Sequence, residues 1–259
     1  MMTFLFWNIN RRFPEEALQA LVRAHDVDVL ILAEAGESSP AKIGELFHSP
    51  GRTPTALILY SRHALLPLEE AQRWTMRSVT TTQGELLIVG THLPSGLHFS
   101  EQDRAMEASH FSRAIRGLEE RRGHERTLLV GDLNMNPFEM GVVGTEGLHA
   151  VSSQQVAQEG KRTVQGREYP FFYNPMWVCL GDAASPTAGT YYYRKANPIC
   201  YFWNTFDQVL IRPSLLPFWM PEELKILTRV GDITLVNSKG RPDSSRFSDH
   251  LPIVFRLDL

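Results

Sequence analysis

Short runs of apolar residues, each about as long as a β-strand, recur along the whole chain. They cover residues 3–7, 28–33, 55–60, 85–91, 127–131, 207–211, 233–236 and 253–257. Most of the runs are bounded by Gly, Pro, Asp or Asn, the residue types that form turns and end strands. We therefore expect a β-strand at each run.

Two segments between the runs have the spacing of an amphipathic helix. The first begins at Pro14, has acidic residues in its first turn, and forms an apolar face from Ala17, Leu18, Leu21 and Val22. The second runs from Ser100, an expected N-cap, to Arg122, and its apolar stripe consists of Ala105, Ala108, Phe111, Ala114, Ile115 and Leu118. In the first part of the chain strands alternate with helices, and in the later part strands follow. This order predicts a mixed α/β (α+β) fold. We expect a four-layered sandwich of two β-sheets with helices on the outside.

The pattern is weakest at residues 144–200, a stretch rich in Gly, Tyr, Pro and Asn. We expect irregular elements and substrate-facing loops there, because loops on a rigid scaffold often carry specificity. No shift in composition marks a domain boundary, and two-sheet folds of about 200–250 residues form one unit. We therefore expect residues 1–259 to be a single domain.

The composition excludes several classes of protein. No stretch approaches the roughly 18 uninterrupted apolar residues of a membrane helix. Residues 1–7 lack the basic region and cleavage site of a secretory signal, so we expect a first strand there and a cytoplasmic location. Cys179 and Cys200 are too few for a disulfide framework, and we expect two reduced thiols, with a lone disulfide as the alternative.

The net charge of −3 argues against a protein that holds nucleic acid by bulk electrostatics. It leaves room for a local basic face, because basic residues cluster at 11–12, 121–122, 161–162 and 194–195. Each cluster is either such a face or ordinary solvated surface.

Polar side chains follow several of the expected strands directly. Asp132 and Asn134 come after the run at 127–131, and the pair Asp249-His250 precedes the run at 253–257. Residues two apart in an extended segment point to the same side, so Asp132 and Asn134 can address one group while Leu133 packs inward. Hydrolysis of a phosphodiester needs a cation, an activated water and a proton for the leaving oxygen. Carboxylates, an amide and a histidine at strand ends indicate this chemistry.

The order of these groups resembles the endonuclease/exonuclease/phosphatase superfamily, which has the DNase I-like fold. In that family, successive strands end in Asn, a metal-binding Glu, His or Tyr, Asp-x-Asn, a lone Asp and a final Asp-His. This chain has, in the same order, Asn8, Glu34, His92, Asp132 with Asn134, Asp207, and Asp249 with His250. The resemblance spans nearly the whole chain and implies the two-sheet fold.

The resemblance also implies a metal site for Mg²⁺ or Mn²⁺. Its carboxylates are Glu34 and Asp249, with Asn8 beside them. Magnesium typically takes one or two protein carboxylates and keeps several waters together with substrate oxygens.

Catalytic roles follow from the same resemblance. It implies that Asp132 positions or deprotonates the attacking water and that Asn134 holds the phosphate. It makes His250 a general base or a charge-stabilising donor, and Asp207 the acid that orients this imidazole and raises its pKa. His92 matches a His or Tyr that bonds the phosphate or helps the leaving group; alternatively, it is a strand-end residue that caps a turn.

The family contains enzymes for several substrates, and we favour a nuclease acting on DNA or RNA. Arg194 and Lys195 are expected to contact backbone phosphates, and the tyrosines at 191–193 form either a base-stacking surface or an ordinary strand. Residues 202–208 lack the Pro-Ala-Trp-x-Asp-Arg pattern of inositol phosphatases. The alternatives are a hydrolase of a small or lipid phosphoester and a catalytically silent binding relative.

Overall fold

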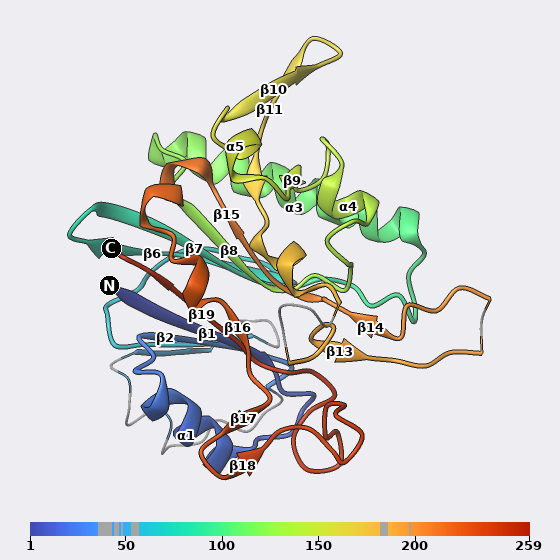
Figure 1. The fold of residues 1–259 in the computed structure, drawn as a ribbon. Helices are drawn as coiled ribbons and strands as arrows, with labels where there is room; N and C mark the ends of the chain where they lie inside the picture. Colours follow the sequence, from blue (N-terminus) through green and yellow to red (C-terminus); the bar gives the residue numbers. More distant parts are fainter. Residues whose placement is uncertain (36–42, 44–46, 48, 53–56, 182–185, 197) are drawn as a thin grey trace.

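Two large β-sheets pack face to face in the computed structural model (Figure 1). The structure describes residues 1–35, 43, 47, 49–52, 57–181, 186–196 and 198–259. One sheet contains both ends of the chain, and its strands in spatial order are β16 (Lys225–Ile226), β19 (Ile253–Leu257), β1 (Met2–Asn8), β2 (Val29–Ala33), β4 (Ile58–Ser61) and β3 (Ser49–Arg52). Strand β1 runs parallel to β2 and antiparallel to β19.

The second sheet is built from the middle of the chain. Its order is β5 (Leu66–Glu70), β6 (Trp74–Thr81), β7 (Gly84–His92), β8 (Thr127–Asp132), β15 (Asp207–Ile211), β12 (Phe172–Tyr173) and β9 (Ala150–Val151). Strands β7 and β8 are parallel and are joined by the long helix α3 (Glu101–Arg122), whereas β15 runs antiparallel to β8.

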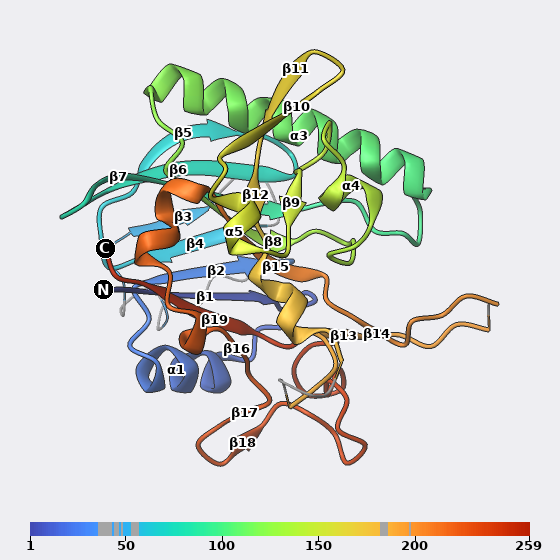
Figure 2. The same cartoon turned by 45° about the horizontal axis from the view of Figure 1, so that its top comes forward.

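Helices cover the outer faces of both sheets (Figure 2). Helix α1 (Glu15–Ala24) lies against the sheet that holds the chain ends, and α3 lies across the second sheet. The other helices among the described residues are short: α4 (Met140–Val143), α5 (Gln154–Ala157), η1 (Pro175–Cys179), η2 (Pro213–Phe218) and η3 (Pro221–Glu223). The order helix, sheet, sheet, helix gives the four layers that the sequence predicts.

The alternation of side chains along the second sheet explains the layers. In β7, Leu86 and Ile88 join the core between the two sheets, whereas Leu87 and Val89 join a second core beneath α3, where they meet Phe111. Successive residues of a strand point to opposite faces, so a run that is apolar throughout must be covered on both sides.

Helix α3 begins and ends where its sequence specifies. The Ser100 hydroxyl accepts from the Asp103 N–H at 3.2 Å, and the Asp103 carboxylate accepts from the Ser100 N–H at 2.9 Å, which forms a capping box. Gly123 ends the helix with φ 73°, a left-handed conformation that favours glycine.

Within the described ranges, three pairs of short strands lie outside the large sheets. They are β10 (Lys161–Val164) with β11 (Arg167–Pro170), β13 (Tyr191–Tyr192) with β14 (Trp203–Asn204), and β17 (Arg229–Val230) with β18 (Ile233–Thr234). The chain between β13 and β14 forms a long arm that extends away from the sheets (Figure 1). The part of residues 144–200 that the structure describes, which leaves out 182–185 and 197, thus contains short elements and loops as expected.

Most of the strand predictions are confirmed, and two need comment. At the run 233–236 a strand is confirmed only for Ile233–Thr234, where β18 pairs with β17 in a separate hairpin around Gly231 and Asp232 and not with either large sheet. Of the run at 55–60, residues 55 and 56 lie outside the described residues, and β4 begins at Ile58. Cys179 and Cys200 are free thiols, as expected. In the part of the chain that is described, no helix is both long and apolar enough to cross a membrane.

Candidate active site

The polar residues identified from the sequence meet because the strands that carry them end at the same side of the two sheets. In the second sheet, Asp132 at the end of β8 is paired in register with His92 of β7 and with Asp207 of β15. In the first sheet, β1 ends at Asn8, and Glu34 directly follows β2. Both sheets therefore deliver acidic and amide groups to one place.

The backbone at this place is tightly constrained. A Cβ atom at Gly131 would lie 2.0 Å from the Thr91 backbone oxygen, so only glycine fits between β7 and β8 there. Three site residues have a left-handed backbone that non-glycine residues rarely adopt, namely Asn10 (φ 45°), Glu34 (φ 52°) and Asn134 (φ 49°). Such strained conformations cluster at functional sites, where the surrounding structure enforces them.

Asn8 connects the carboxylates of the two sheets. Its fully buried side chain donates through Nδ2 to Glu34 Oε1 at 3.1 Å and to Asp132 Oδ2 at 2.9 Å. Its Oδ1 accepts from the Asn10 N–H at 3.0 Å. In this structure Asn8 therefore holds two acids, and its own oxygen is engaged by the backbone.

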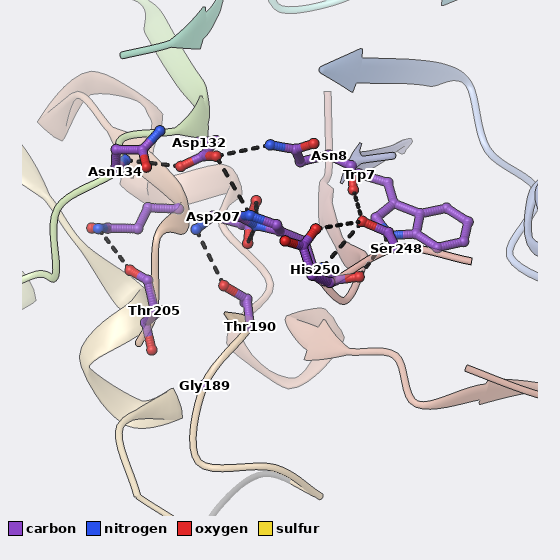
Figure 3. A network of polar contacts seen from close by, with 12 residues as sticks. Trp7, Asn8, Asp132, Asn134, Gly189, Thr190, Thr205, Asp207, Ser248 and His250 are labelled. Atoms are coloured by element: carbon purple, nitrogen blue, oxygen red, sulfur yellow. Dashed lines mark hydrogen bonds and ion pairs between the residues drawn. The ribbon is translucent and has the colours of Figure 1, made fainter. Parts of the chain in front are cut away.

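Asp249 is held from the loop that follows β1. The Asn10 side-chain amide donates to Asp249 Oδ1 at 2.8 Å. Beside it, the Ser248 hydroxyl donates to the Asn8 carbonyl at 2.6 Å and accepts from the His250 N–H at 3.1 Å. These contacts bring the end of the chain against its beginning (Figure 3).

His250 and Asp207 form a buried pair. The His250 Nδ1 atom lies 2.8 Å from Asp207 Oδ2 and 3.1 Å from Oδ1, so this nitrogen carries the hydrogen. The other ring nitrogen, Nε2, lies 3.8 Å from Asp132 Oδ2. Burial lowers the pKa of His250, but the facing carboxylates, chiefly Asp207 and Asp132, outweigh it and raise the pKa to about 10. The raised pKa favours the protonated form of this imidazole, which lies between the two acids.

His92 faces the same acid from the other side. Its Nε2 lies 3.7 Å from Asp132 Oδ2 and 3.5 Å from Glu34 Oε1. Its side chain is about a quarter exposed, which leaves it open to a substrate. These contacts with two acids do not fit the alternative in which His92 only caps a turn.

Asn134 is fixed on several sides. Its N–H donates to Asp132 Oδ1 at 2.8 Å, and its Nδ2 donates to the Leu93 carbonyl at 2.9 Å. Arg104, from the first turn of α3, donates to the Asn134 carbonyl at 2.5 Å and pairs with Glu139 at 2.9 Å. The expected inward packing of Leu133 is also present, because this side chain is fully buried beneath α3.

These residues line a cleft with a volume of about 880 Å³. Its floor includes Glu34, His92, Asp132, Asn134, Asp249 and His250, and its walls include Arg11, Arg73, Phe99, Tyr191, Tyr193, Lys195, Ile199 and Tyr201. Asn8 and Asp207 lie behind the floor and are fully buried. Of the two basic residues predicted to bind substrate, Lys195 lines the cleft with its ammonium 5.2 Å from the centre of the Tyr193 ring. Arg194 is exposed and is not among the lining residues.

The tyrosine run at 191–193 divides between two environments. Tyr191 and Tyr193 face the cleft, whereas Tyr192 packs against Trp203 and lies under the Arg241 guanidinium at 4.0 Å. The run thus includes the strand β13 and also supplies two aromatic rings to the cleft, and the stacking of bases on these rings stays a prediction.

The charges on the cleft floor fit a bound cation. Glu34, Asp132 and Asp249 converge there, and the neutral amides of Asn8 and Asn10 contact all three. Asp132, Asp207 and His250 also have ligand atoms within 4.8 Å of one another. However, the Asp207–His250 hydrogen bond occupies two members of that group, and Asp207 is fully buried. Glu34 and Asp249 also line the cleft, so their carboxylate oxygens could hold a divalent ion there.

Four residues at the site have contacts that the sequence did not predict. They are Asn10, Arg104, Thr190 and Tyr191. Asn10 had a signal, because it stands two residues after Asn8 in the same segment. The other three come from α3, from the residue before β13 and from the start of β13, and only the folded chain brings them to the site.

A family model described as the Endonuclease/Exonuclease/phosphatase family matches residues 5–250 of the chain. A comparison with curated protein sequences finds no match. Solved structures with a similar fold include NExo from Neisseria, a 3′ phosphatase bound to a product DNA hairpin, which is 16% identical with a TM-score of 0.56 and full coverage of both chains.

Two further structures have similar scores. TDP2 from D. rerio, complexed with a single-strand DNA product, is 16% identical with a TM-score of 0.56, and 98% of this chain and 97% of that chain are covered. Sphingomyelinase C from Streptomyces griseocarneus is 12% identical with a TM-score of 0.56, and 98% of each chain is covered. At these identities the similarity concerns the fold.

Proposed function

Because the chain belongs to the endonuclease/exonuclease/phosphatase family, we propose that it hydrolyses phosphodiester bonds of DNA or RNA with the help of a divalent cation. We propose further that residues 1–259 act as one catalytic domain. The observation that carries the proposal is the position of Asp132 Oδ2 at the floor of the cleft, between His92 Nε2 at 3.7 Å and His250 Nε2 at 3.8 Å.

Asp132 is suited to orient the attacking water and take its proton. Its Oδ1 accepts from the Asn134 N–H and its Oδ2 from Asn8, so the carboxylate is held in one orientation. A base that is already oriented avoids the cost of reorganisation during the reaction.

His250 is suited to stabilise charge on the phosphate. Asp207 holds its Nδ1, and its Nε2 faces the cleft. The raised pKa of His250 favours the protonated form, which donates a hydrogen bond to a phosphate oxygen. Of the two roles that the resemblance left open, the structure therefore supports the charge-stabilising donor.

Glu34 and Asp249 would hold Mg²⁺ or Mn²⁺, and Asn8 and Asn10 would keep these two carboxylates in place. When bound, the cation supplies positive charge that offsets the charge developing on the phosphate. His92 lies beside Glu34 and is placed to bond a phosphate oxygen or the leaving oxygen.

The aromatic and basic side chains in the walls of the cleft are suited to bind nucleic acid. Phe99, Tyr193 and Tyr201 offer exposed ring faces, and Lys195 and Arg73 lie against two of these rings. Bases stack on such rings, at about 1–3 kcal/mol per base, while the cations meet backbone phosphates. The NExo and TDP2 structures contain DNA, which supports the same class of substrate.

A lipid phosphoester is a second candidate, favoured by one observation. Two aliphatic side chains that line the cleft are largely exposed, Leu97 at 59% and Ile199 at 75%. Exposed apolar groups gathered at a site mark contact with an apolar partner, and one structure of similar fold is a sphingomyelinase.

The test is a panel of labelled substrates resolved by product length. Purified protein is incubated with single- and double-stranded DNA and RNA, and with sphingomyelin vesicles, in Mg²⁺, in Mn²⁺ or in chelator. The variant His250→Asn, whose amide can still bond Asp207, removes the imidazole, and His110→Asn on the exposed face of α3 is the matched control.

Cleavage of a nucleic acid that requires metal, persists in His110→Asn and is lost in His250→Asn is the expected result. Turnover of the vesicles alone would replace the nuclease with a lipid phosphodiesterase. Binding of a nucleic acid without any metal-dependent turnover would instead identify a catalytically silent relative.

A further inference from the structure

The segment that leads into β13 contacts both members of the His250–Asp207 pair. Thr190 is fully buried, and its hydroxyl accepts from the Asp207 N–H at 3.3 Å (Figure 3). Its carbonyl accepts from the Leu251 N–H at 2.8 Å, next to His250. This short segment is therefore tied to the strand that carries the acid and to the loop that carries the histidine.

Tyr191 continues the contact on the ring itself. It forms an isolated antiparallel bridge with His250, and the two ring centres lie 4.6 Å apart with an angle of 38° between their planes. Phe206 packs on Tyr191 with ring centres 5.3 Å apart. The phenol ring thus lies against the imidazole and is itself packed by two aromatic residues, Phe206 and Tyr193, the latter with its ring centre 6.2 Å away.

The rest of the segment is built to hold Tyr191 at this position. The Thr190 N–H donates to the Asn204 carbonyl at 2.9 Å. A Cβ atom at Gly189 would lie 2.6 Å from the same carbonyl oxygen, so glycine is required for this close approach. The position of Tyr191 is therefore set by its backbone as well as by ring packing.

The other contacts of His250 do not fix the rotation of its imidazole ring about χ2. Trp7 Nε1 donates to its carbonyl at 2.9 Å, Ser248 accepts from its N–H, and Asp207 holds Nδ1. The χ2 torsion of histidine has a broad minimum, and a hydrogen bond at one nitrogen permits the ring to rock about that bond. Such rocking moves Nε2 relative to Asp132, and a ring packed on one face opposes it.

We propose that Tyr191 is a positioning residue, whose ring holds the His250 imidazole with Nε2 directed at the cleft floor beside Asp132. The proposal rests on the proposed hydrolysis for its effect on rate. The ring performs this role and the hydroxyl is dispensable for it, so phenylalanine should substitute for tyrosine.

The test compares Tyr191→Met, which fills space without a ring, with Tyr191→Phe. The matched control is Tyr192→Met, because Tyr192 is the next residue of β13 and packs away from the cleft against Trp203. Thermal unfolding verifies that each variant folds, and Tyr191→Leu replaces Tyr191→Met if that variant does not.

Two measurements are made on each protein. The first is kcat and KM on the substrate found in the panel. Tyr191→Met should lower kcat by about 10²-fold, the scale on which a misplacement of about 1 Å acts, and change KM far less. Tyr191→Phe should restore most of the lost kcat.

The second measurement is the NMR shift of the His250 Hε1 proton, assigned by its absence in His250→Asn. A stacked ring shifts this proton, and we expect the shift to be lost in Tyr191→Met and kept in Tyr191→Phe and Tyr192→Met. This readout requires no substrate. If the wild type hydrolyses nothing, the proposed function fails, and the Hε1 shift still decides whether Tyr191 holds the ring.

An unchanged kcat or an unchanged Hε1 shift in Tyr191→Met would overturn the proposal. Equal losses in Tyr191→Phe and Tyr191→Met would also overturn it, because they would assign the effect to the hydroxyl.

Discussion

The Nε2 atom of His250 lies 3.8 Å from Oδ2 of Asp132, although the two residues are 118 positions apart and belong to opposite sheets of the sandwich. Asp132 ends β8 of the second sheet, and His250 precedes β19 of the first. The two side chains are close because the end of β8 and the start of β19 lie at the same edge of the sandwich. Packing between the sheets is therefore also what assembles the site.

Replacing Asp207 by Asn should lower turnover while the protein stays folded. The carboxylate holds Nδ1 of His250 and favours its charged form, and an amide does neither well. General acid–base and related contributions of this kind are worth about 10²–10⁴-fold in rate. Steady-state kinetics measure the loss, with Asp232→Asn in the exposed turn of the β17–β18 hairpin as the control. Normal turnover in Asp207→Asn would remove the pair from the mechanism.

A divalent ion should bind at Glu34 and Asp249. Titration calorimetry with Mn²⁺ should show a site in the wild type that weakens in Glu34→Gln and in Asp249→Asn, because each variant removes one charged oxygen ligand. Glu222→Gln, an exposed acid outside the cleft, should bind as the wild type does. If Asp207→Asn alone abolished binding, the ion would instead belong to the buried group of Asp132, Asp207 and His250.

Lys195 should contribute more to substrate binding than Arg194. Lys195 lines the cleft, and Arg194 is exposed outside it. If Lys195 meets one phosphate, Lys195→Glu should reduce the slope of log K against log salt by about 1 and weaken binding most at low salt. Arg194→Glu should change the slope less. Equal slopes in wild type and the double variant would exclude both residues from phosphate contact.

A buried ion pair should dominate the stability of the second sheet. Arg212, which follows β15, donates to both oxygens of Glu119 in α3 at 2.8 and 2.9 Å, and both side chains are at most 4% exposed. Removing one partner of such a pair costs about 3–5 kcal/mol, because the other charge stays buried. Urea unfolding of Glu119→Gln should show this loss, and the exposed neighbour Glu120→Gln should show little. A loss below about 1 kcal/mol would mean that the guanidinium finds other partners.

Glu85 should make stability depend on pH in the acid range. Partial burial opposes its charge, but hydrogen bonds from Arg122 and His124 outweigh burial and lower the pKa of Glu85 to about 2, against an ordinary value of 4.5. A lowered pKa stabilises the folded state fully above 4.5, and this contribution is lost as the pH falls toward 2.

The measurement for Glu85 is the difference in unfolding free energy between wild type and Glu85→Gln at several pH values. Because Glu85 is near the surface, we expect a difference of about 1 kcal/mol at pH 6 that shrinks on acidification. A difference that is constant with pH would show that this carboxylate is not preferentially charged in the folded state.

The sequence predicts the fold well where a strand is apolar and poorly where a buried strand is polar. Strands β7, β8 and β15 are recognised from their apolar runs, and family membership, inferred from the order of polar residues at the strand ends, is confirmed. Strand β6 was missed because it contains Thr75, Arg77 and Ser78, all buried. Arg77 is accommodated by Glu70 of the neighbouring strand at 2.6 Å, a contact that no local pattern reveals.

The site residues also fall into two groups, those that the sequence predicts and those that only the folded structure reveals. Residues next to an apolar strand, such as Asp132 at the end of β8 and His250 shortly before β19, are found from the order of the elements. Thr190 and Tyr191 are not, because their contacts with Asp207 and His250 depend on how a weakly patterned segment returns to the sheets. Nothing in the sequence distinguishes Arg104 from the other polar residues of α3. Only its hydrogen bond to the Asn134 carbonyl, seen in the structure, shows that it belongs to the site.

The most direct test of the proposed chemistry uses bis(p-nitrophenyl) phosphate, a diester with neither base nor lipid. Its hydrolysis is followed in Mn²⁺ for the wild type and for Asp132→Asn, whose single amide oxygen can accept from only one of the two donors, Asn8 Nδ2 or the Asn134 N–H, so thermal unfolding first verifies that this variant folds. We expect metal-dependent hydrolysis by the wild type that stops in chelator and falls by about 10²-fold or more in Asp132→Asn. Equal rates in the two proteins, or a rate that persists in chelator, would contradict hydrolysis at this cleft floor.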